Sequence, residues 1–256
     1  MKYDLYFGDC IDIMLQLVTM GIQVDAVITD PPYGTTACKW DSVISFNKMW
    51  DCLYKLRRNE QVPIILFGNE PFSSTLRLSN IKHYKYDIYW KKEKLTNVLQ
   101  VKKRVGKTIE NIMLFYEKQC YFDPQKKLHD GKLRTNKIKN GKLGGLIDSQ
   151  EKKAVFYRDD RTRYPIDVWE YNRDISVSNI HPTQKPVALM ENLIKTYTKE
   201  GDAVLDFTCG SGSTGVACVK LNRNFIGIDN DYCEKEGVFE NWKWVDVTKY
   251  RIENKK

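Results

Sequence analysis

Short apolar runs alternate along the chain with segments whose apolar residues recur at helical spacing. The runs of strand length cover residues 3–7, 25–29, 64–67, 87–90, 111–116, 203–206 and 224–229. Helical spacing marks residues 11–20, 187–194 and 215–221. Nearly continuous apolar strands that alternate with helical segments are typical of a largely parallel sheet covered on both faces. The pattern predicts an α/β fold, and the polar chain beyond Lys249 is expected to fray.

The apolar runs stop between Lys118 and Tyr164, where Lys, Arg, Asp, Gly and Gln dominate. This stretch carries thirteen basic and six acidic side chains, so it accounts for nearly all of the formal net charge of +8. Concentrated positive charge is typical of a surface that faces phosphate groups. A solvated insertion without a partner would have the same composition, and charge alone leaves both interpretations open.

The composition narrows the class of protein. With 256 residues, 42% of them hydrophobic, the chain suits one large α/β domain with a modest insertion. Its seven cysteines are scattered and form no Cys-x-x-Cys pair, which disfavours both a zinc site and a disulfide framework. Polar residues interrupt the first apolar stretch, so no signal peptide is expected, and no run approaches the roughly 20 apolar residues of a membrane span. The sequence predicts a soluble, cytoplasmic protein without a metal.

The apolar run 203–206 opens into a glycine-rich turn, Gly210-Ser211-Gly212-Ser213-Thr214-Gly215, and the next strand ends in Asp229. A strand, a glycine turn, a helix and a second strand with a terminal acid form a nucleotide-type unit, in which the acid binds ribose hydroxyls. Asp206 and Asp229 lie 23 residues apart. The turn has no P-loop lysine, and we expect a nucleoside ligand without a pyrophosphate, with S-adenosylmethionine as the candidate.

Asp30-Pro31-Pro32-Tyr33 follows another apolar run and has the groups to bind a planar amine. The lone pair of an exocyclic base nitrogen is delocalised into the ring, so the nitrogen is a poor nucleophile. Hydrogen-bond acceptors on both amine protons would help, and the Asp30 carboxylate and the Pro31 carbonyl supply two. The proline pair stiffens the turn, and the Tyr33 ring offers a stacking surface. A duplex base would have to flip out to reach this pocket.

Four features in this order resemble the β class of amino-DNA methyltransferases. They are Asp30-Pro31-Pro32-Tyr33, the basic region, His181-Pro182-Thr183-Gln184-Lys185-Pro186, and Asp206 with Gly210-Ser211-Gly212. The resemblance implies a circularly permuted, Rossmann-like methyltransferase fold with seven mostly parallel strands, helices on both faces and a small basic target-recognition insertion. It implies a catalytic half over residues 1–117, a basic target-recognition region over 118–180 and a cofactor-binding half over 181–256.

The same resemblance assigns roles to individual residues. Asp30, Pro31, Pro32 and Tyr33 are the expected catalytic residues. The expected cofactor-binding residues are Asp9, Cys10, Thr183, Lys185, Asp206, Phe207, Gly210, Ser211, Gly212 and Asp229. Asp9 matches the acid at the adenine end and Asp229 the ribose-binding acid. Phe207 departs from the family, which often has Pro at this position.

DNA contacts are expected from basic residues after the run 87–90 and in the basic region. These are Lys91, Lys92, Lys102, Lys103, Arg158, Arg161 and Arg163. Residues 97–103 resemble the stretch that lines the target-base pocket of the family. The tyrosines among the later arginines suit nucleic acid, and a small subdomain core explains them equally well.

The resemblance implies site-specific methylation of double-stranded DNA at the N6 of adenine, with S-adenosylmethionine as methyl donor. Within the family, Asp at the first position of the tetrapeptide favours adenine as the target base. N4-cytosine methylation and RNA methylation remain open, as does a catalytically silent DNA-binding protein of the same fold. C5-cytosine chemistry needs a Pro-Cys pair, which the chain lacks. A separate restriction endonuclease and a second copy of the chain are the protein partners left open.

Overall fold

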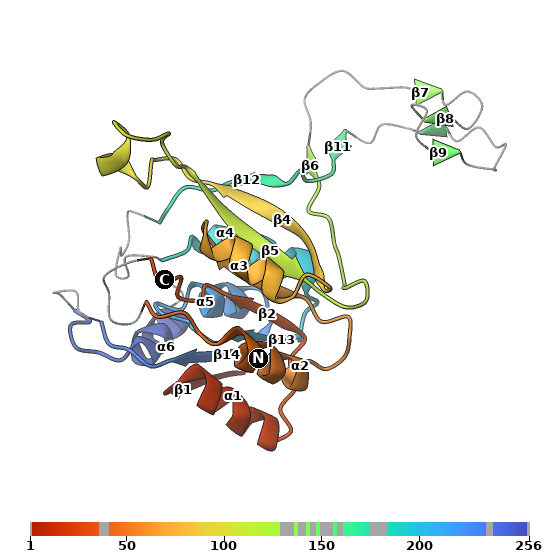
Figure 1. Cartoon of the computed structure of the whole chain (residues 1–256). Helices are drawn as coiled ribbons and strands as arrows, with labels where there is room; N and C mark the ends of the chain where they lie inside the picture. Colours follow the sequence, from red (N-terminus) through yellow and green to blue (C-terminus); the bar gives the residue numbers. More distant parts are fainter. Residues whose placement is uncertain are drawn as a thin grey trace. The chain divides into compact units, whose positions relative to one another are not determined.

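A computed structural model describes residues 2–35, 41–128, 161–174, 184–233 and 238–254, together with the backbone of four residue pairs between 136 and 157. The chain divides into two compact units (Figure 1). The first consists of Met1–Asp123 and Asp167–Lys256, and the second of Pro124–Ile166. The second unit is shorter at both ends than the basic region expected over residues 118–180.

The first unit is built on one eight-stranded sheet with the order β1-β14-β13-β2-β3-β5-β4-β12. The strands are β1 (Tyr3–Phe7), β2 (Ala26–Thr29), β3 (Ile64–Gly68), β4 (Tyr84–Lys91), β5 (Ile109–Phe115), β12 (Val168–Glu170), β13 (Ala203–Asp206) and β14 (Asn224–Asp229). Every neighbouring pair is parallel except for the two pairs that involve β5. The first strand of the chain pairs with the last, the arrangement expected of a circular permutation.

The sheet has one strand more than the seven expected. The additional strand is β12, which extends the edge of the sheet by pairing Val168 with Tyr89 and Trp169 with Trp90. Trp169 is buried in the core, and this burial holds the short segment on the sheet. A three-residue strand that follows a long polar stretch gives too weak a pattern to be predicted from the sequence.

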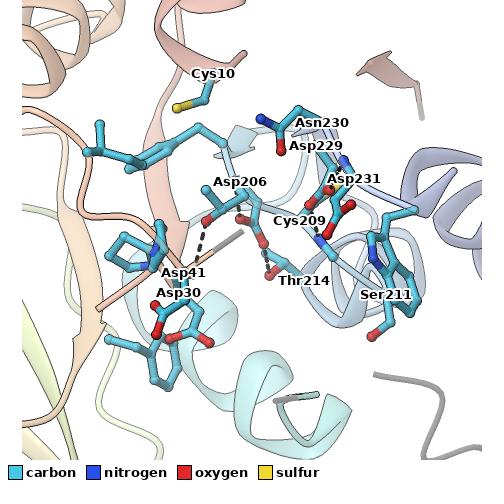
Figure 2. Close-up of a pocket in the computed structure, with 18 of the residues that line it drawn as sticks. Cys10, Asp30, Asp41, Asp206, Cys209, Ser211, Thr214, Asp229, Asn230 and Asp231 are labelled. Carbon is cyan, nitrogen blue, oxygen red and sulfur yellow. Dashed lines mark hydrogen bonds between the residues drawn. The ribbon is translucent and has the colours of Figure 1, made fainter. Parts of the chain in front are cut away.

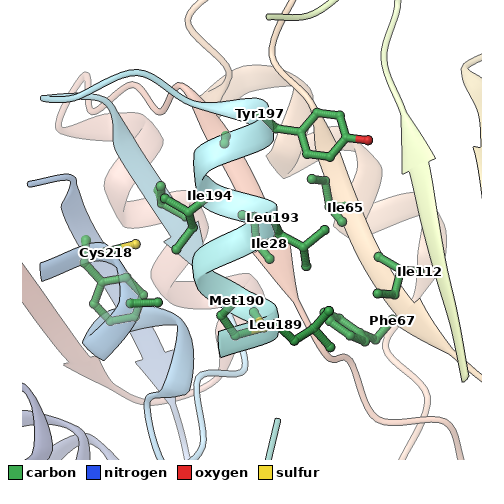
Figure 3. Close-up of a cluster of buried hydrophobic side chains, with 14 of the residues drawn as sticks. Ile28, Ile65, Phe67, Ile112, Leu189, Met190, Leu193, Ile194, Tyr197 and Cys218 are labelled. Carbon is green, nitrogen blue, oxygen red and sulfur yellow. The ribbon is translucent and has the colours of Figure 1, made fainter. Parts of the chain in front are cut away.

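Helices cover both faces of the sheet. They are α1 (Cys10–Thr19), α2 (Phe46–Leu56), α3 (Phe72–Ser79), α4 (Val187–Tyr197), α5 (Ser213–Lys220) and α6 (Trp244–Asn254). One core cluster packs the first three helices on the sheet and the other packs the last three. Within β2, Ile28 belongs to the α4 side and Val27 to the opposite side, as the alternation of a strand requires. Figure 3 shows α4 packed over Ile28, Ile65 and Phe67.

Residues 250–254, where fraying was expected, are helical. Helix α6 continues to Asn254, and Arg251 and Ile252 are buried. The Arg251 guanidinium donates a hydrogen bond to the carbonyl oxygen of Ser211, so it ties the helix to the glycine-rich turn. The expectation was wrong because the two buried residues stand alone in a polar stretch and produce little hydrophobic periodicity.

The second unit contains short antiparallel pairs. Strand β6 (Lys127–Leu128) pairs with β11 (Thr162–Arg163), β7 (Asn136–Lys137) with β10 (Phe156–Tyr157), and β8 (Lys142–Leu143) with β9 (Ile147–Asp148). The Lys126 ammonium lies 4.6 Å from the centre of the Tyr164 ring. In the described part of the chain, no helix combines the length and the apolar character needed to cross a membrane.

Candidate active site

A pocket lies at the carboxyl edge of the parallel strands (Figure 2). Residues after β1, β2, β13 and β14 line it, including Asp9, Asp30, Asp206 and Asp229. In open α/β sheets, ligands bind beyond the carboxyl ends of the strands, where neighbouring loops diverge. The structure therefore brings the two motifs of the sequence, nearly 180 residues apart, into one cavity.

Asp206 ends β13 and is almost fully buried beneath the glycine-rich turn. Its carboxylate accepts hydrogen bonds from the hydroxyls of Thr29 and Thr214, each at 2.6 Å. Burial raises the pKa of Asp206 to about 6, although these hydroxyl donors partly oppose the shift. This carboxylate connects β2 to the start of α5 and shapes the floor of the pocket.

Asp229 ends β14 and lines the pocket beside the glycine-rich turn. One carboxylate oxygen accepts a hydrogen bond from the backbone N–H of Gly210 at 2.8 Å, and the other accepts one from the N–H of Asp231 at 3.1 Å. Burial raises its pKa to about 6, against the opposing effect of those two N–H donors. Each oxygen keeps a second lone pair for a ligand hydroxyl.

Gly212 allows the turn to approach α6. Its φ of 76° lies in the left-handed region, and a Cβ there would come within 2.5 Å of the Thr248 side chain. The glycines at 210, 212 and 215 also have the spacing of a dinucleotide-binding turn, so their spacing alone does not exclude a dinucleotide. The next residue, Ser213, lines the pocket with a buried hydroxyl that has no hydrogen-bond partner. Such a hydroxyl is available to a ligand.

At the other end of the pocket, Asp9 and Cys10 follow β1. The Asp9 carboxylate caps α1 by accepting hydrogen bonds from the backbone N–H groups of Ile11 and Asp12. Burial raises the pKa of the Cys10 thiol to about 12, so this side chain lines the pocket as an uncharged thiol. Phe207 is fully buried in the core on the α1 side, where its bulk replaces the small ring of the proline common in the family.

Asp41 holds the backbone that follows the two prolines of the tetrapeptide Asp30-Pro31-Pro32-Tyr33. One oxygen of Asp41 accepts hydrogen bonds from the backbone N–H groups of Tyr33 and Gly34 at 2.7 and 2.8 Å, and the other accepts one from Thr35 at 2.9 Å. The Tyr33 ring lies 5.0 Å from the Phe72 ring. These bonds fix the backbone that follows the two prolines.

The Asp30 carboxylate belongs to a network of buried charges. The Tyr33 hydroxyl donates to one oxygen of Asp30, and the Lys185 ammonium donates to the other. Lys185 also lies 2.9 Å from Glu110, and the Tyr33 hydroxyl lies 3.2 Å from the same carboxylate. Lys92 pairs with the second oxygen of Glu110. Two carboxylates and two ammonium groups thus form one network, and both carboxylates contact the Tyr33 hydroxyl.

The network fixes the charge of each member. Burial raises the pKa of Asp30, the Lys185 charge opposes this shift, and the Glu110 charge adds to it. Burial disfavours ionised Glu110 as well, but Lys185 and Lys92 outweigh it and hold the pKa of Glu110 at about 2. The pKa of Lys185 is raised because its two carboxylate partners outweigh burial. Glu110 is therefore ionised and Lys185 is charged near neutral pH.

Hydrogen bonds join the two halves of the site. The Thr208 hydroxyl, which follows the cofactor strand β13, donates to the carbonyl oxygen of Asp30 at 3.0 Å. It also lies 2.7 Å from the Thr29 hydroxyl, which in turn donates to Asp206. These bonds link the Asp30-Pro31-Pro32-Tyr33 tetrapeptide to the end of β13 and the glycine-rich turn.

The expected DNA-binding residues fall into different environments. Lys102 and Lys103 are exposed on the loop between β4 and β5, and Lys91 is exposed with its ammonium 2.8 Å from Glu170. Lys92 lies within the Glu110 network, which differs from the surface position expected of it. Arg161 and Arg163 lie in the second unit. Arg158 and the expected cofactor residue Thr183 are outside the described residues.

Sequence reasoning missed Glu110, Asp41 and Ser213. Glu110 carried one signal, an acid within an apolar strand run, and Asp41 carried none beyond its proximity to the tetrapeptide. Lys185 was expected near the methionine end of the cofactor, whereas the structure pairs it with Asp30. Among the residues with described side chains, no cluster of three or more His, Cys, Asp or Glu is arranged to hold a metal.

A mostly parallel sheet with helices on both faces, and two acids beside a glycine turn at its carboxyl edge, place the protein in the class of Rossmann-like nucleotide-binding folds. The sequence profile N6_N4_Mtase, described as DNA methylase, matches residues 24–238, and the protein belongs to this family.

The chain is similar to named proteins over most of its length. It is 25% identical over 242 residues to the type II methyltransferase M1.MboII of Moraxella bovis, covering 86% of this chain and 89% of that protein. It is 28% identical over 220 residues to the DNA adenine methyltransferase YhdJ of Escherichia coli K12, covering 80% and 71%. The crystal structure of the M1.HpyAVI–SAM complex superposes with a TM-score of 0.62 at 23% identity, covering 98% of both chains.

Proposed function

We propose that this protein transfers a methyl group from S-adenosylmethionine to the exocyclic N6 of adenine in double-stranded DNA. One observation carries the proposal: the Asp30 carboxylate lies in the same pocket as Asp206 and Asp229, at the carboxyl edge of the sheet. Membership in the DNA methylase family gives the reaction class. Asp at position 30 and the similarity to a protein named as a DNA adenine methyltransferase favour adenine over cytosine.

The pocket fits S-adenosylmethionine by its donor and acceptor groups. Asp229 offers free lone pairs for two ribose hydroxyls, and the unpartnered Ser213 hydroxyl offers a polar contact by the glycine-rich turn. Gly210 and Gly212 let the backbone come close to the ligand. When bound, this cofactor supplies a methyl group on a positively charged sulfur. The neutral thioether that remains after transfer is a good leaving group.

The residues of the chain would prepare the amine. The Asp30 carboxylate and the Pro31 carbonyl accept hydrogen bonds from its two N–H groups, which favours a tetrahedral nitrogen with an available lone pair. Lys185 and Tyr33 hold the Asp30 side chain in one orientation through one bond to each oxygen, and each oxygen keeps a further lone pair. The bonds through Thr208 fix the distance from Asp30 to the cofactor half, so alignment costs little at the moment of reaction.

The first experiment incubates the protein with isotopically labelled S-adenosylmethionine and unmethylated genomic DNA, digests the DNA to nucleosides and identifies the labelled product by mass spectrometry. We expect N6-methyladenine. Labelled N4-methylcytosine would retain the mechanism and overturn the base assignment. Absence of label from DNA, with label in RNA or nowhere, would overturn the proposal.

Cofactor affinity is expected to fall as the pH is lowered through about 6, because protonated Asp229 and Asp206 lose acceptor capacity. If binding requires only Asp229 to be ionised, the Kd at pH 5 exceeds that at pH 8 by about tenfold, since one pH unit below the pKa corresponds to one factor of ten. Calorimetric titration of S-adenosylmethionine over this range provides the measurement.

An Asp229→Asn variant is expected to bind more weakly at pH 8 and to show a reduced pH dependence, while Asp4→Asn, on the exposed surface of β1, matches the wild type. A Kd independent of pH in the wild type would contradict the role of these acids.

A further inference from the structure

The loop between β4 and β5, residues 92–108, is a built structure with internal hydrogen bonds. The Asn97 side chain donates to the carbonyl of Val105 at 3.0 Å and accepts from the N–H of Lys107 at 2.7 Å. The backbone N–H of Thr96 donates to the Lys107 carbonyl at 2.8 Å. A short 3-10 turn, Val98–Gln100, forms the tip. The loop therefore holds its tip in a defined position.

The tip presents apolar side chains to solvent. Leu99 is fully exposed, and Val98 and Val105 are 62% and 90% exposed. Isolated exposed apolar residues are common on proteins, but three on one hydrogen-bonded loop form a local apolar surface. Since none of these side chains packs on the core, the fold does not need them for stability.

The same loop is strongly basic. Lys94, Lys102, Lys103 and Arg104 are all exposed around the apolar tip. Its one acid, Glu93, pairs with Arg173 at the base of the loop. Exposed apolar and basic side chains on one loop are complementary to a DNA duplex, in which the stacked bases lie between two phosphate backbones.

The loop starts and ends at the catalytic network. Lys92, its first residue, pairs with Glu110, and the Lys92 backbone N–H donates to the Thr108 carbonyl at 2.8 Å. Glu110 in turn contacts Lys185 and Tyr33. In Figure 1 the loop is the yellow segment that extends from the ends of β4 and β5. A duplex contacted by the tip would thus lie beside the Asp30 pocket.

We propose that Val98 and Leu99 form an apolar wedge that enters the base stack of the DNA duplex at the place vacated by the target base. This inference rests on the proposed function, because it assigns Val98 and Leu99 to the step that delivers the base to Asp30. Removing a base leaves a gap between its neighbours, and an apolar side chain that fills the gap replaces part of the lost stacking. Lys102, Lys103 and Arg104 would hold the flanking phosphates.

A second copy of the chain is a poorer occupant of this tip. Exposed apolar residues also serve protein interfaces, but the chain carries a formal net charge of +8. Packing the basic loop of one copy against another would bring like charges together, whereas DNA brings opposite charges.

The test compares wild type, Leu99→Ala and the control Leu78→Ala, which truncates a 73% exposed leucine on α3. The substrates are two oligonucleotide duplexes that carry the mapped methylation site, one with the target base paired and one with it opposite an abasic position. We expect Leu99→Ala to lower kcat/KM on the paired duplex by about tenfold or more, since the alanine side chain is too short to replace the lost base stacking. On the abasic duplex, the loss should be about twofold or less.

A direct readout replaces the target base with 2-aminopurine, whose fluorescence rises when it leaves the stack. Wild type and Leu78→Ala should raise the fluorescence on binding, and Leu99→Ala should raise it much less at saturating protein. A Leu99→Met variant, which keeps apolar volume, should recover most of the signal.

Two results would overturn the wedge. One is an equal loss on both duplexes, or no loss on either. The other is a change in oligomeric mass for Leu99→Ala by light scattering, which would assign the tip to a second copy. Failure of the wild type to methylate any DNA would instead overturn the proposed function, and the wedge with it.

Discussion

Replacing Asp30 with alanine is expected to lower kcat for methyl transfer by about 10³-fold or more while cofactor affinity changes by less than threefold. Removing one preorganised group that acts on the transition state typically costs roughly 10²–10³-fold in kcat. The loss here should lie at or above that range, because the variant also leaves Lys185 without one of its two carboxylates. Single-turnover rates with labelled cofactor, and calorimetry for affinity, provide the measurements.

Two variants make this result specific. Asp30→Asn keeps the size of the side chain but presents an amide N–H₂ in place of one acceptor oxygen, so it should be nearly as inactive as alanine. Asp51→Ala removes an exposed acid that pairs with Lys55 on α2, and it should retain wild-type activity. Asp30→Ala with more than a tenth of the wild-type rate would place the amine-binding acid elsewhere.

Much of the fold follows from the sequence because buried parallel strands leave a continuous apolar run. The runs at 203–206 and 224–229 coincide with β13 and β14, and that at 3–7 coincides with β1. The two chemical motifs were also readable, since each follows such a strand directly. The short edge strand β12 and the end of α6 were not, because each is held by one or two buried residues such as Trp169 and Arg251.

The charge network was beyond prediction for a topological reason. A residue at the start of a parallel strand lies at the amino edge of the sheet, away from the site. Strand β5 runs antiparallel to β3 and β4, so its second residue, Glu110, lies at the carboxyl edge beside Asp30. A sequence gives the period of a strand and not its direction. The partner Lys185 is 75 residues further along, and no local pattern relates the two.

The positive charge of Lys185 favours the ionised form of Asp30. Replacing this lysine with methionine is expected to lower kcat at pH 7.5 by about 10²-fold, since losing one partner of a buried charge pair costs several kcal/mol in the affected interactions. The pH dependence gives the sharper test. Asp30 must be ionised to accept from the amine, so activity is lost as the pH falls through its raised pKa.

Lys185 and Glu110 act on this pKa in opposite directions. The positive charge of Lys185 lowers the pKa of Asp30 and the negative charge of Glu110 raises it. Lys185→Met should therefore move the acid limb of the kcat profile to higher pH, and Glu110→Gln should move it to lower pH. Lys185→Arg keeps the charge and should move the limb less than Lys185→Met. A purely structural role would lower kcat at every pH without moving the limb.

The opposite signs separate electrostatics from damage to the fold. If both variants moved the acid limb in the same direction, the group that titrates would not be Asp30 in this network. If both variants left the limb unmoved, Asp30 would be ionised over the whole pH range measured. Lys185 would then act only by linking Asp30 to Glu110 on β5. Opposite shifts would show that a lysine and a glutamate remote in sequence set the working pH range of the carboxylate that receives the base.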